Sequence, residues 1–461
     1  RHRLHCMTNR FFTFGCCTLL PLAAMAQQRP NIIYIMSDQQ AATDMSCAGN
    51  NDVKTPNMDR LAERGMRFTN AYCTLPLSGP SRAAMWTGYM PSVIGMEENE
   101  TPLPDSIAVR TLGTLIENSG YDCALAGKWH VNTNSLPSEH AFGFKNIHQF
   151  MDNGLSESVI NYLRNRDSKK PFFLVASFNN PHGICEYARR QNVPYGDIDL
   201  NPELADCPQL PANFAVSPYD ASTLQFEKKR NQRLYPSYDY TPDDWRRYLY
   251  GYYRLTETVD AQIGQILEEM DRQDLWKNTI VIFSSDHGDG AAQHQWNQKT
   301  VLYESVANIP FIVCMPKGKN AGKVMPQLIS NGLDLMPTVC DFAGVEIPKH
   351  CTGKSIRKVL ESGKEDTPLR DYVVTETVFA QTAGTIGWMV RTKDFKYVLY
   401  DSGRNREQLF DMNNDRGEMR NLAVERRYHD ILVEHRRMLS EWMDQNPSKL
   451  TRLKAKYIPR N

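Results

Sequence analysis

Four short apolar runs along the chain each lead directly into a cluster of polar residues. They occupy residues 31–36, 121–126, 172–176 and 279–283. The runs are almost continuously apolar, which is typical of strands covered on both faces and therefore of a mainly parallel sheet. In such sheets ligands bind outside the carboxyl ends of the strands. We therefore expect the four polar clusters to meet at one edge of the sheet.

Helical patterns fill the intervals between these strands. Thr55 and Pro56 provide a cap and a first-turn proline for a helix that ends at Gly65. A longer helix begins at Thr241 and carries apolar residues at helical spacing as far as Ile266, which predicts a stripe facing the core. Strands alternating with helices predict the α/β class, with a large, mainly parallel sheet sandwiched between helices.

Two later segments depart from this alternation. Residues 183–240 are rich in proline, tyrosine and charge, and they predict a long irregular insertion of the kind that recognises substrate. After about residue 366 the pattern predicts a small antiparallel sheet closed by a helix near 431–443. The strands of this small sheet are expected at 372–375, 387–391 and 397–400.

The first 26 residues read as an export signal with a few residues upstream of it. Arg10 precedes the apolar run 11–22, and small residues around Ala26 suit a cleavage site. Cys16 leaves a lipid anchor as an alternative, although the residues before it lack the usual aliphatic side chain. We therefore predict a periplasmic or secreted protein, with a catalytic domain over 27–365 and a C-terminal α+β subdomain over 366–461.

Composition excludes several classes of function. Lys plus Arg and Asp plus Glu both number 53 in the 461 residues, so no overall field steers the protein to nucleic acid or to a membrane surface. No segment after the signal is apolar for long enough to span a bilayer. Eight of the 11 cysteines follow the signal without paired spacings, which predicts neither a zinc site nor a dense disulfide framework, although one or two bridges remain open.

The segment from Ser78 to Gly88, with Pro80 and Arg82 within it, resembles the maturation signature of the type I sulfatases of the alkaline phosphatase superfamily. Taken alone, Pro80 would equally suit an ordinary polar turn at a helix start. In that family a maturation enzyme oxidises the first residue, a Cys or in some bacteria a Ser, to Cα-formylglycine. The resemblance implies that one hydroxyl of the hydrated aldehyde attacks sulfur and that the other then lets sulfate leave, which an unmodified serine does not allow.

Oxygen and nitrogen ligands follow the first and the last of the four runs. Asp38 and Gln39 end the first, and Asp286 and His287 end the last. A single Asp after a strand is usually a turn cap, but an oxygen-rich set is what Ca²⁺ prefers. The resemblance implies that these four residues and the oxidised Ser78 bind Ca²⁺. The family often has Asp and Asn where Gln39 and His287 stand, so this site carries less negative charge.

The resemblance also assigns residues to the sulfate group. It implies that Arg82 holds the aldehyde hydrate, and that Lys128 and His130, which project to the same side of an extended segment, reach the sulfate. His182 would protonate the leaving oxygen, and Lys299 would contact both the sulfate and that oxygen. Taken alone, each is an ordinary loop residue. A cation with Lys, Arg and His donors would stabilise the charge that develops in the transition state, and a histidine with a pKa near the working pH is a natural proton donor.

The expected activity is Ca²⁺-dependent hydrolysis of an O-sulfate ester on a carbohydrate, such as a glycosaminoglycan or mucin sugar. The expected partners are that sulfated carbohydrate and the maturation enzyme, with no nucleic acid. Two alternatives stay open: a phosphodiester or phosphonate monoester hydrolase of the same superfamily, and a non-catalytic sulfoglycan-binding protein in which Ser78 is unmodified or introduced in place of Cys. Candidate sugar contacts in and beside the insertion are Arg189, Arg190, Glu186, Tyr187, Trp245 and Arg246.

Overall fold

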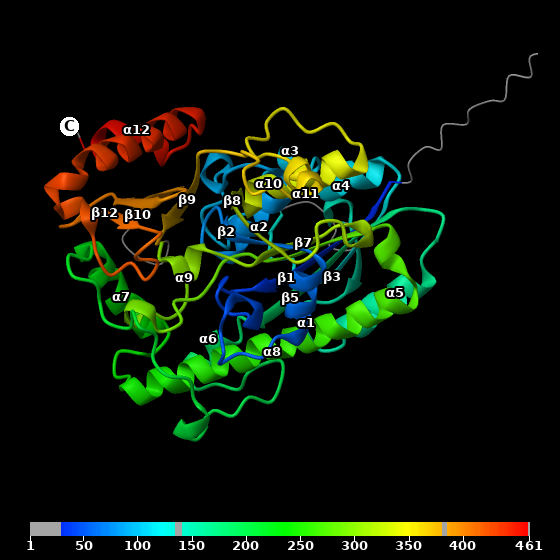
Figure 1. The fold of residues 1–461 in the computed structure, drawn as a ribbon, viewed down its shortest axis with the longest axis horizontal. Helices are drawn as coiled ribbons and strands as arrows, with labels where there is room; N and C mark the ends of the chain where they lie inside the picture. Colours follow the sequence, from blue (N-terminus) through cyan, green and yellow to red (C-terminus); the bar gives the residue numbers. More distant parts are fainter. Residues whose placement is uncertain (1–28, 134–140, 380–384, 460–461) are drawn as a thin grey trace, which may run out of the picture.

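The computed structural model describes residues 29–133, 141–379 and 385–459, and the predicted export signal lies outside them. An eight-stranded sheet, in the order β4-β3-β5-β1-β6-β7-β2-β8, forms the centre (Figure 1). All neighbouring strands are parallel except at β7, which is antiparallel to β6 and β2. The mainly parallel sheet is therefore confirmed. Its strands are β1 (Asn31–Asp38), β2 (Met66–Tyr72), β3 (Asp122–Gly127), β4 (Lys145–His148), β5 (Phe172–Pro181), β6 (Thr279–Ser285), β7 (Phe311–Cys314) and β8 (Lys323–Ser330).

Helices cover both faces of this sheet, as Figure 1 shows. Because successive strand residues point to opposite faces, Ile32 and Tyr34 of β1 pack in one core with α2, α4, α10 and α11. Ile33 and Ile35 pack in a second core with α1, α5 and α8. The predicted sandwich is therefore confirmed. The helices of these two layers are α1 (Pro56–Arg64), α2 (Ser78–Thr87), α4 (Leu112–Asn118), α5 (Leu155–Asn165), α8 (Pro242–Arg272), α10 (Asn331–Ala343) and α11 (Arg357–Ser362), with the short α3 (Asp105–Ala108) beside them.

The two predicted helix starts differ in how they are capped. The Thr241 hydroxyl accepts a hydrogen bond from Asp244 N at 3.3 Å, and Thr241 N donates to the Asp244 carboxylate at 2.9 Å, a complete capping box. Thr55 does not cap α1, because its hydroxyl accepts from Ser46 N at 2.9 Å instead. The preceding loop competes for this side chain, so the predicted Thr55 cap was wrong while the helix itself is present.

A four-stranded antiparallel sheet follows, in the order β12-β11-β10-β9. The helix α12 packs on one of its faces, and Val373, Met389 and Val398 on the other face pack against Tyr72 and Trp296 of the large domain. The predicted small sheet and its helix are present, and β12 is an additional strand. The elements are β9 (Tyr372–Val378), β10 (Ile386–Thr392), β11 (Phe395–Tyr400), β12 (Glu407–Asp411), α12 (His429–Gln445) and α13 (Lys454–Tyr457).

A buried ion-pair cluster lies between the small sheet and the large domain. Lys396 of β11 is fully buried, and its Nζ lies 3.2 Å from Glu304 Oε1 and 2.6 Å from Glu418 Oε1. Glu304 belongs to the short helix α9 (Glu304–Ala307) of the large domain. The carboxylate of Glu304 also lies 3.5 Å from Arg416. This charged contact joins the two sheets in addition to their apolar packing.

The insertion at 183–240 is more ordered than predicted. It contains α6 (Ile184–Ala188) and α7 (Ser222–Leu234) between irregular stretches. Arg246 of α8 attaches the insertion, because its guanidinium donates to the carbonyls of Leu204, Cys207 and Pro208 at 2.8 to 3.1 Å. All eight cysteines in the described ranges are unpaired. No helix within those ranges is long and apolar enough to cross a membrane.

Candidate active site

The polar clusters that follow β3, β5, β1 and β6 meet at one edge of the sheet, because these four strands are immediate neighbours. The first turn of α2 brings Ser78 to the same place. Its Oγ lies 3.0 Å from His287 Nε2 and 3.2 Å from Asp38 Oδ2. All three side chains are fully buried. The sequence therefore located the edge at which the candidate residues gather.

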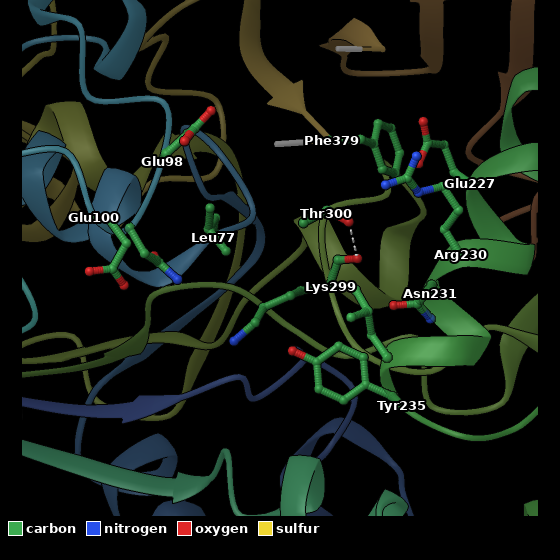
Figure 2. A pocket seen from close by; sticks show the side chains of 12 residues that line it. Leu77, Glu98, Glu100, Glu227, Arg230, Asn231, Tyr235, Lys299, Thr300 and Phe379 are labelled. Carbon is green, nitrogen blue, oxygen red and sulfur yellow. Dashed lines mark hydrogen bonds between the residues drawn. The ribbon is translucent and has the colours of Figure 1, made fainter. Parts of the chain in front are cut away.

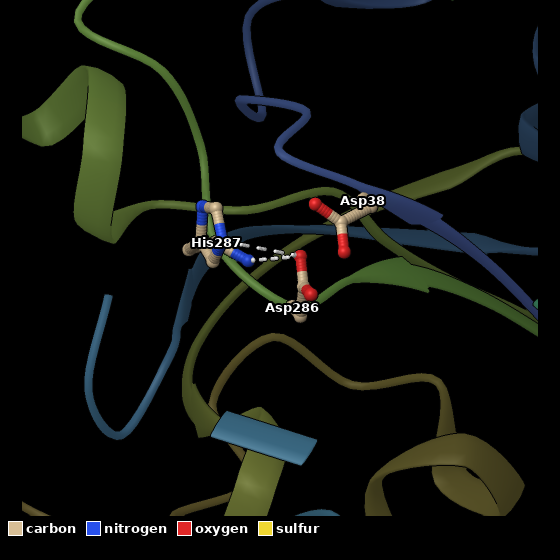
Figure 3. Close-up of side chains that lie close together, drawn as sticks. All are labelled: Asp38, Asp286 and His287. Carbon is tan, nitrogen blue, oxygen red and sulfur yellow. Dashed lines mark hydrogen bonds and ion pairs between the residues drawn. The ribbon is translucent and has the colours of Figure 1, made fainter. Parts of the chain in front are cut away.

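Asp38, Asp286 and His287 form a set that can bind a metal ion (Figure 3). One ligand atom from each lies within 4.8 Å of the other two. His287 Nδ1 lies 2.9 Å from the Gly288 carbonyl, so Nδ1 carries the proton and Nε2 presents its lone pair toward Ser78. Burial lowers the pKa of His287, which keeps the ring in the neutral form that binds metals. Two carboxylates with this imidazole fit a hard divalent cation.

Arg82 contacts the two carboxylates of this set. Its Nε donates to Asp286 Oδ2 and one terminal nitrogen donates to Asp38 Oδ2, both at 2.9 Å. The other terminal nitrogen donates to Lys128 O and to Ser177 Oγ, also at 2.9 Å. The guanidinium is fully buried and has no hydrogen bond to Ser78 among the described contacts. The role expected for Arg82 at the aldehyde hydrate stays a prediction, whereas its contacts with the carboxylates are observed.

Lys128 extends the same charged network. Its Nζ lies 2.8 Å from Asp38 Oδ2 and donates to Asn179 Oδ1 at 3.1 Å. Burial opposes ionisation of Asp38, but the nearby charges of Lys128 and Arg82 hold the pKa of that carboxyl well below its usual range. Asn179 lies in a polar cluster that the sequence indicated, but its contact with Lys128 was not predicted. The Asp38 carboxylate is therefore ionised and ready to bind a cation.

The two candidate histidines are held in the neutral form. Burial, followed by the charges of Lys128 and Arg82, lowers the pKa of His130 to about 3. Its backbone φ is 58°, and its buried Nδ1 has no hydrogen-bond partner in the described structure. Burial and the charges of Lys128 and Lys299 likewise lower the pKa of His182 well below its usual range. In the described structure neither histidine therefore has a pKa near the working pH, and the role of a histidine as proton donor stays a prediction.

Gln39 and Lys299 lie on the other side of the metal set. The amide Oε1 of Gln39 accepts from Lys299 Nζ at 3.0 Å. Its Nε2 donates to Asp289 Oδ2 at 2.8 Å and to Gln298 Oε1 at 3.0 Å. Sequence reasoning missed Asp289 and Gln298. Asp289 stands three residues after Asp286, and a second carboxyl residue so close to an expected metal ligand could have identified it as a candidate site residue.

The candidate sugar contacts divide into two groups. Trp245 is only 3% exposed, and Tyr187 is also buried, so both belong to the core and were wrong as sugar contacts. The prediction of Arg246 as a sugar contact was also wrong, because its guanidinium donates hydrogen bonds to backbone carbonyls of the insertion. Arg189 and Arg190 are exposed at the end of α6, and Glu186 is half-buried. Arg189 lies 4.5 Å from the centroid of the Tyr235 ring.

A cavity of about 180 Å³ is lined by Leu77, the residue before Ser78, and by Lys299 and Thr300 (Figure 2). The ammonium of Lys299 and the hydroxyl of Tyr235 point into the space between two walls, as Figure 2 shows. One wall contains Glu98, Asn99 and Glu100, and the other comes mainly from α7, with Glu227, Arg230, Asn231 and Leu234.

Comparison with known proteins gives consistent relatives. The sulfatase family model matches residues 30–345, and a model described as N-sulphoglucosamine sulphohydrolase, C-terminal, matches 292–445. A Delta 4,5-hexuronate-2-O-sulfatase of Bacteroides thetaiotaomicron is 33% identical over 95% of this chain and 94% of the relative. An N-acetylglucosamine-6-O-sulfatase of the same organism is 28% identical over 93% and 90%.

Solved structures have the same architecture. A structure described as a 2-O GAG sulfatase superimposes with a TM-score of 0.76 and 30% identity, covering 91% of this chain and 93% of that one. A phosphonate monoester hydrolase of Agrobacterium radiobacter superimposes with a TM-score of 0.73 at 21% identity, covering 91% and 96%. The second likeness shows a shared fold alone.

Proposed function

Because the chain belongs to the sulfatase family and is a sulfuric ester hydrolase, we propose that it removes O-sulfate groups from a sulfated carbohydrate, with Ser78 matured to formylglycine and Ca²⁺ bound beside it. The observation that carries the proposal is the position of Ser78. Its Oγ lies between the candidate metal ligands Asp38 and His287, at the edge where Lys128 approaches Asp38. An oxidised residue at position 78 would thus adjoin both a cation and a group that attracts sulfate.

The residues of the chain divide the chemical work. When present, a hydrated aldehyde at position 78 supplies the hydroxyl that attacks sulfur and a second hydroxyl whose proton loss expels sulfate, and Ca²⁺ stabilises the negative charge. Lys128 and Lys299 hold the sulfuryl oxygens by charge. His182, protonated from solvent water, delivers its proton to the leaving oxygen. Burial and the charges of Lys128 and Lys299 lower the pKa of His182, and the negative charge of a bound sulfate ester would oppose this lowering.

Two features support a carbohydrate as the substrate. The side chain of Phe150 is 55% exposed, and its ring centroid lies 5.4 Å from the Lys128 ammonium. An exposed aromatic face at this position can pack against the apolar face of a sugar ring. The related hexuronate and N-acetylglucosamine enzymes also act, by their names, on sulfated sugars. We therefore propose a glycosaminoglycan- or mucin-type sugar, and no nucleic acid, as the substrate.

The second candidate is hydrolysis of a phosphodiester or phosphonate monoester, the latter being the activity named for a structure that shares this fold. A comparison of matched sulfate and phosphonate esters in one assay separates the two activities. We expect the sulfate ester to have the higher kcat/KM. A higher kcat/KM for the phosphonate would assign the chain to the second activity.

The maturation of Ser78 is tested by mass spectrometry of the peptide spanning residues 68–82. Co-expression with a serine-specific maturation enzyme should remove one hydrogen molecule from this peptide and give active protein. Expression without that enzyme should give folded, inactive protein with an unchanged peptide. Turnover by protein that carries only unmodified serine would refute the mechanism. An unmodified serine in inactive protein from the natural host would favour the sulfoglycan-binding alternative.

Export is a separate proposal, supported by the apolar segment after Arg10 and the small residues near Ala26. Fractionation of expressing cells and N-terminal sequencing should give a periplasmic or secreted protein that begins near residue 27. A full-length cytoplasmic product would contradict it, and a lipid on Cys16 would instead identify a surface lipoprotein.

A further inference from the structure

Asp289 is a fully buried carboxylate behind the candidate metal set. It accepts hydrogen bonds from four donor groups in the described structure. Burying a carboxylate is costly unless its oxygens accept hydrogen bonds. A buried carboxylate with this many donors therefore fixes the positions of the groups that donate to it. The donors are Gln39 Nε2 at 2.8 Å, Tyr248 OH at 2.8 Å, Gln298 N at 3.0 Å and Ala291 N at 2.7 Å.

These contacts determine which end of the Gln39 amide faces Asp289 and which end faces Lys299. Asp289 Oδ2 and Gln298 Oε1 are both acceptors, and both contact Gln39 Nε2. The amide oxygen must therefore point the other way, toward Lys299 Nζ at 3.0 Å. A reversed amide would place its oxygen against the Asp289 carboxylate. Such an assignment of oxygen and nitrogen follows from the hydrogen-bond network, and here the network permits one orientation.

We propose that Asp289 is a positioning residue for the metal site, which directs the Gln39 oxygen toward the cation and supplies the negative charge that Gln39 lacks. This inference rests on the proposed Ca²⁺ site. An N–H donor bonded to a carboxylate polarises its amide, so the oxygen at the other end becomes a better ligand. Gln39 and Asp289 thereby act as one unit. The neutral amide of Gln39 provides the ligand oxygen, and the carboxylate of Asp289, bonded to the other end of that amide, provides the negative charge.

The test exchanges the two functional groups. Asp289→Asn removes the negative charge beside Gln39, and its NH₂ must face either Ala291 N or both Gln39 Nε2 and Gln298 N, so Ca²⁺ affinity should fall by about 10- to 100-fold. Gln39→Glu alone places a second carboxylate against Asp289. The double variant Gln39→Glu with Asp289→Asn restores one carboxylate and one amide in hydrogen-bond contact. It should bind Ca²⁺ more tightly than either single variant.

The measurement is the Ca²⁺ dissociation constant, determined by calorimetry on protein purified with Ser78 unmodified and freed of metal by chelation. Tyr248→Phe is the matched control, because it removes another donor from Asp289 and leaves the Gln39 contact intact. We expect the control to keep the parental dissociation constant, with the thermal midpoint of each metal-free variant measured alongside. If Asp289→Asn does not fold, the double variant is compared with Gln39→Glu alone. Tighter Ca²⁺ binding by the double variant then supports the proposal that residues 39 and 289 act together.

Two results would overturn the inference in distinguishable ways. Unchanged Ca²⁺ affinity in Asp289→Asn, or a double variant no tighter than the single variants, would make Asp289 a structural residue and leave the Ca²⁺ site intact. Absence of Ca²⁺ binding by the parent protein, measured with Ser78 matured as well as unmodified, would overturn the Ca²⁺ site together with this inference. The matured form is included because the oxidised residue 78 is itself an expected Ca²⁺ ligand.

Discussion

Replacement of Lys396 by methionine should destabilise the contact between the two sheets. Lys396 is fully buried and forms ion pairs with Glu304 and Glu418. Methionine fills a similar volume, so packing is kept and the perturbation is electrostatic. Loss of one partner from a buried ion pair leaves uncompensated charge and costs about 3–5 kcal/mol, which we expect as the loss in free energy of unfolding.

The size of the effect can be compared with that of a solvent-exposed pair in the same subdomain. Arg437 and Glu441 of α12 form an ion pair with 52% and 50% of their side chains exposed. Exposed pairs contribute about 0–1 kcal/mol, so Arg437→Met is the matched control. Urea denaturation followed by tryptophan fluorescence, in which Trp388 reports on the small sheet, measures both variants. Equal losses in the two variants would refute the argument that burial makes the Lys396 pairs strong.

The pH dependence of Lys396→Met provides a second check. Burial raises the pKa of Glu418 to about 7 although the Lys396 charge opposes this rise, and the same charge helps to hold the pKa of Glu304 below its usual value against the effect of burial. Removal of the lysine charge therefore raises both pKa values in the folded state. A carboxyl whose folded pKa is raised binds a proton that the unfolded chain releases, so stability falls as pH rises through that range. The deficit of the variant should therefore be larger at about pH 8 than at about pH 5. Adding Glu418→Gln should recover much of the loss, and no recovery would contradict the pairing.

Four further measurements test the site and the fold. His182→Ala should lower turnover of a sugar sulfate by about 10²-fold or more, and turnover of a nitrophenyl sulfate far less, because only the sugar needs a proton on its leaving oxygen. Equal losses on the two substrates would assign the proton donor to Lys299. Phe150→Ala should raise KM for the sugar sulfate while leaving kcat similar, and an unchanged KM would remove Phe150 from the sugar site. Chelation should abolish turnover and Ca²⁺ should restore it better than Zn²⁺, and full activity of protein shown by elemental analysis to be metal-free would refute metal dependence. Burial raises the pKa of Glu376 from 4.5 to about 7, so this residue makes stability fall as pH rises through that interval, and Glu376→Gln should raise the thermal midpoint more at about pH 8 than at about pH 5. Equal shifts at both pH values would contradict the assigned pKa.

The strands of the large sheet were predictable because a strand that is buried on both faces has a continuous run of apolar residues. The run 279–283 is continuously apolar, and it forms β6 with every residue buried. The helix α7 has no corresponding apolar pattern in its sequence. It buries Glu227 and Lys228 in place of a regular apolar stripe, so its sequence resembles an exposed, irregular segment. Periodicity reports apolar packing, and elements stabilised by polar contacts are missed.

The same limit applies to the site. Asp38, Gln39, Asp286 and His287 followed strands, so parallel topology alone predicts that they gather at one edge. Asp289 could not be assigned from topology, because its task depends on hydrogen bonds from four donor groups, which lie in distant parts of the chain as well as near ones. Conversely, Trp245 was offered as a sugar contact because of its chemistry, although its place in the apolar stripe of α8 indicated the core.

The positions of the charged groups explain how one site can accept both a cation and an anion. Arg82 bonds to Oδ2 of both Asp38 and Asp286, and Lys128 approaches the same Oδ2 of Asp38. Both oxygens of Asp38 lie near Ser78, Oδ2 at 3.2 Å and Oδ1 at 3.4 Å from its Oγ. The buried cations therefore offset the negative charge of two carboxylates whose ligand atoms lie within 4.8 Å of each other. In the proposed mechanism a divalent cation and an anionic substrate would bind to groups that the folded protein already holds close together, so the cost of bringing like charges together is part of the cost of folding.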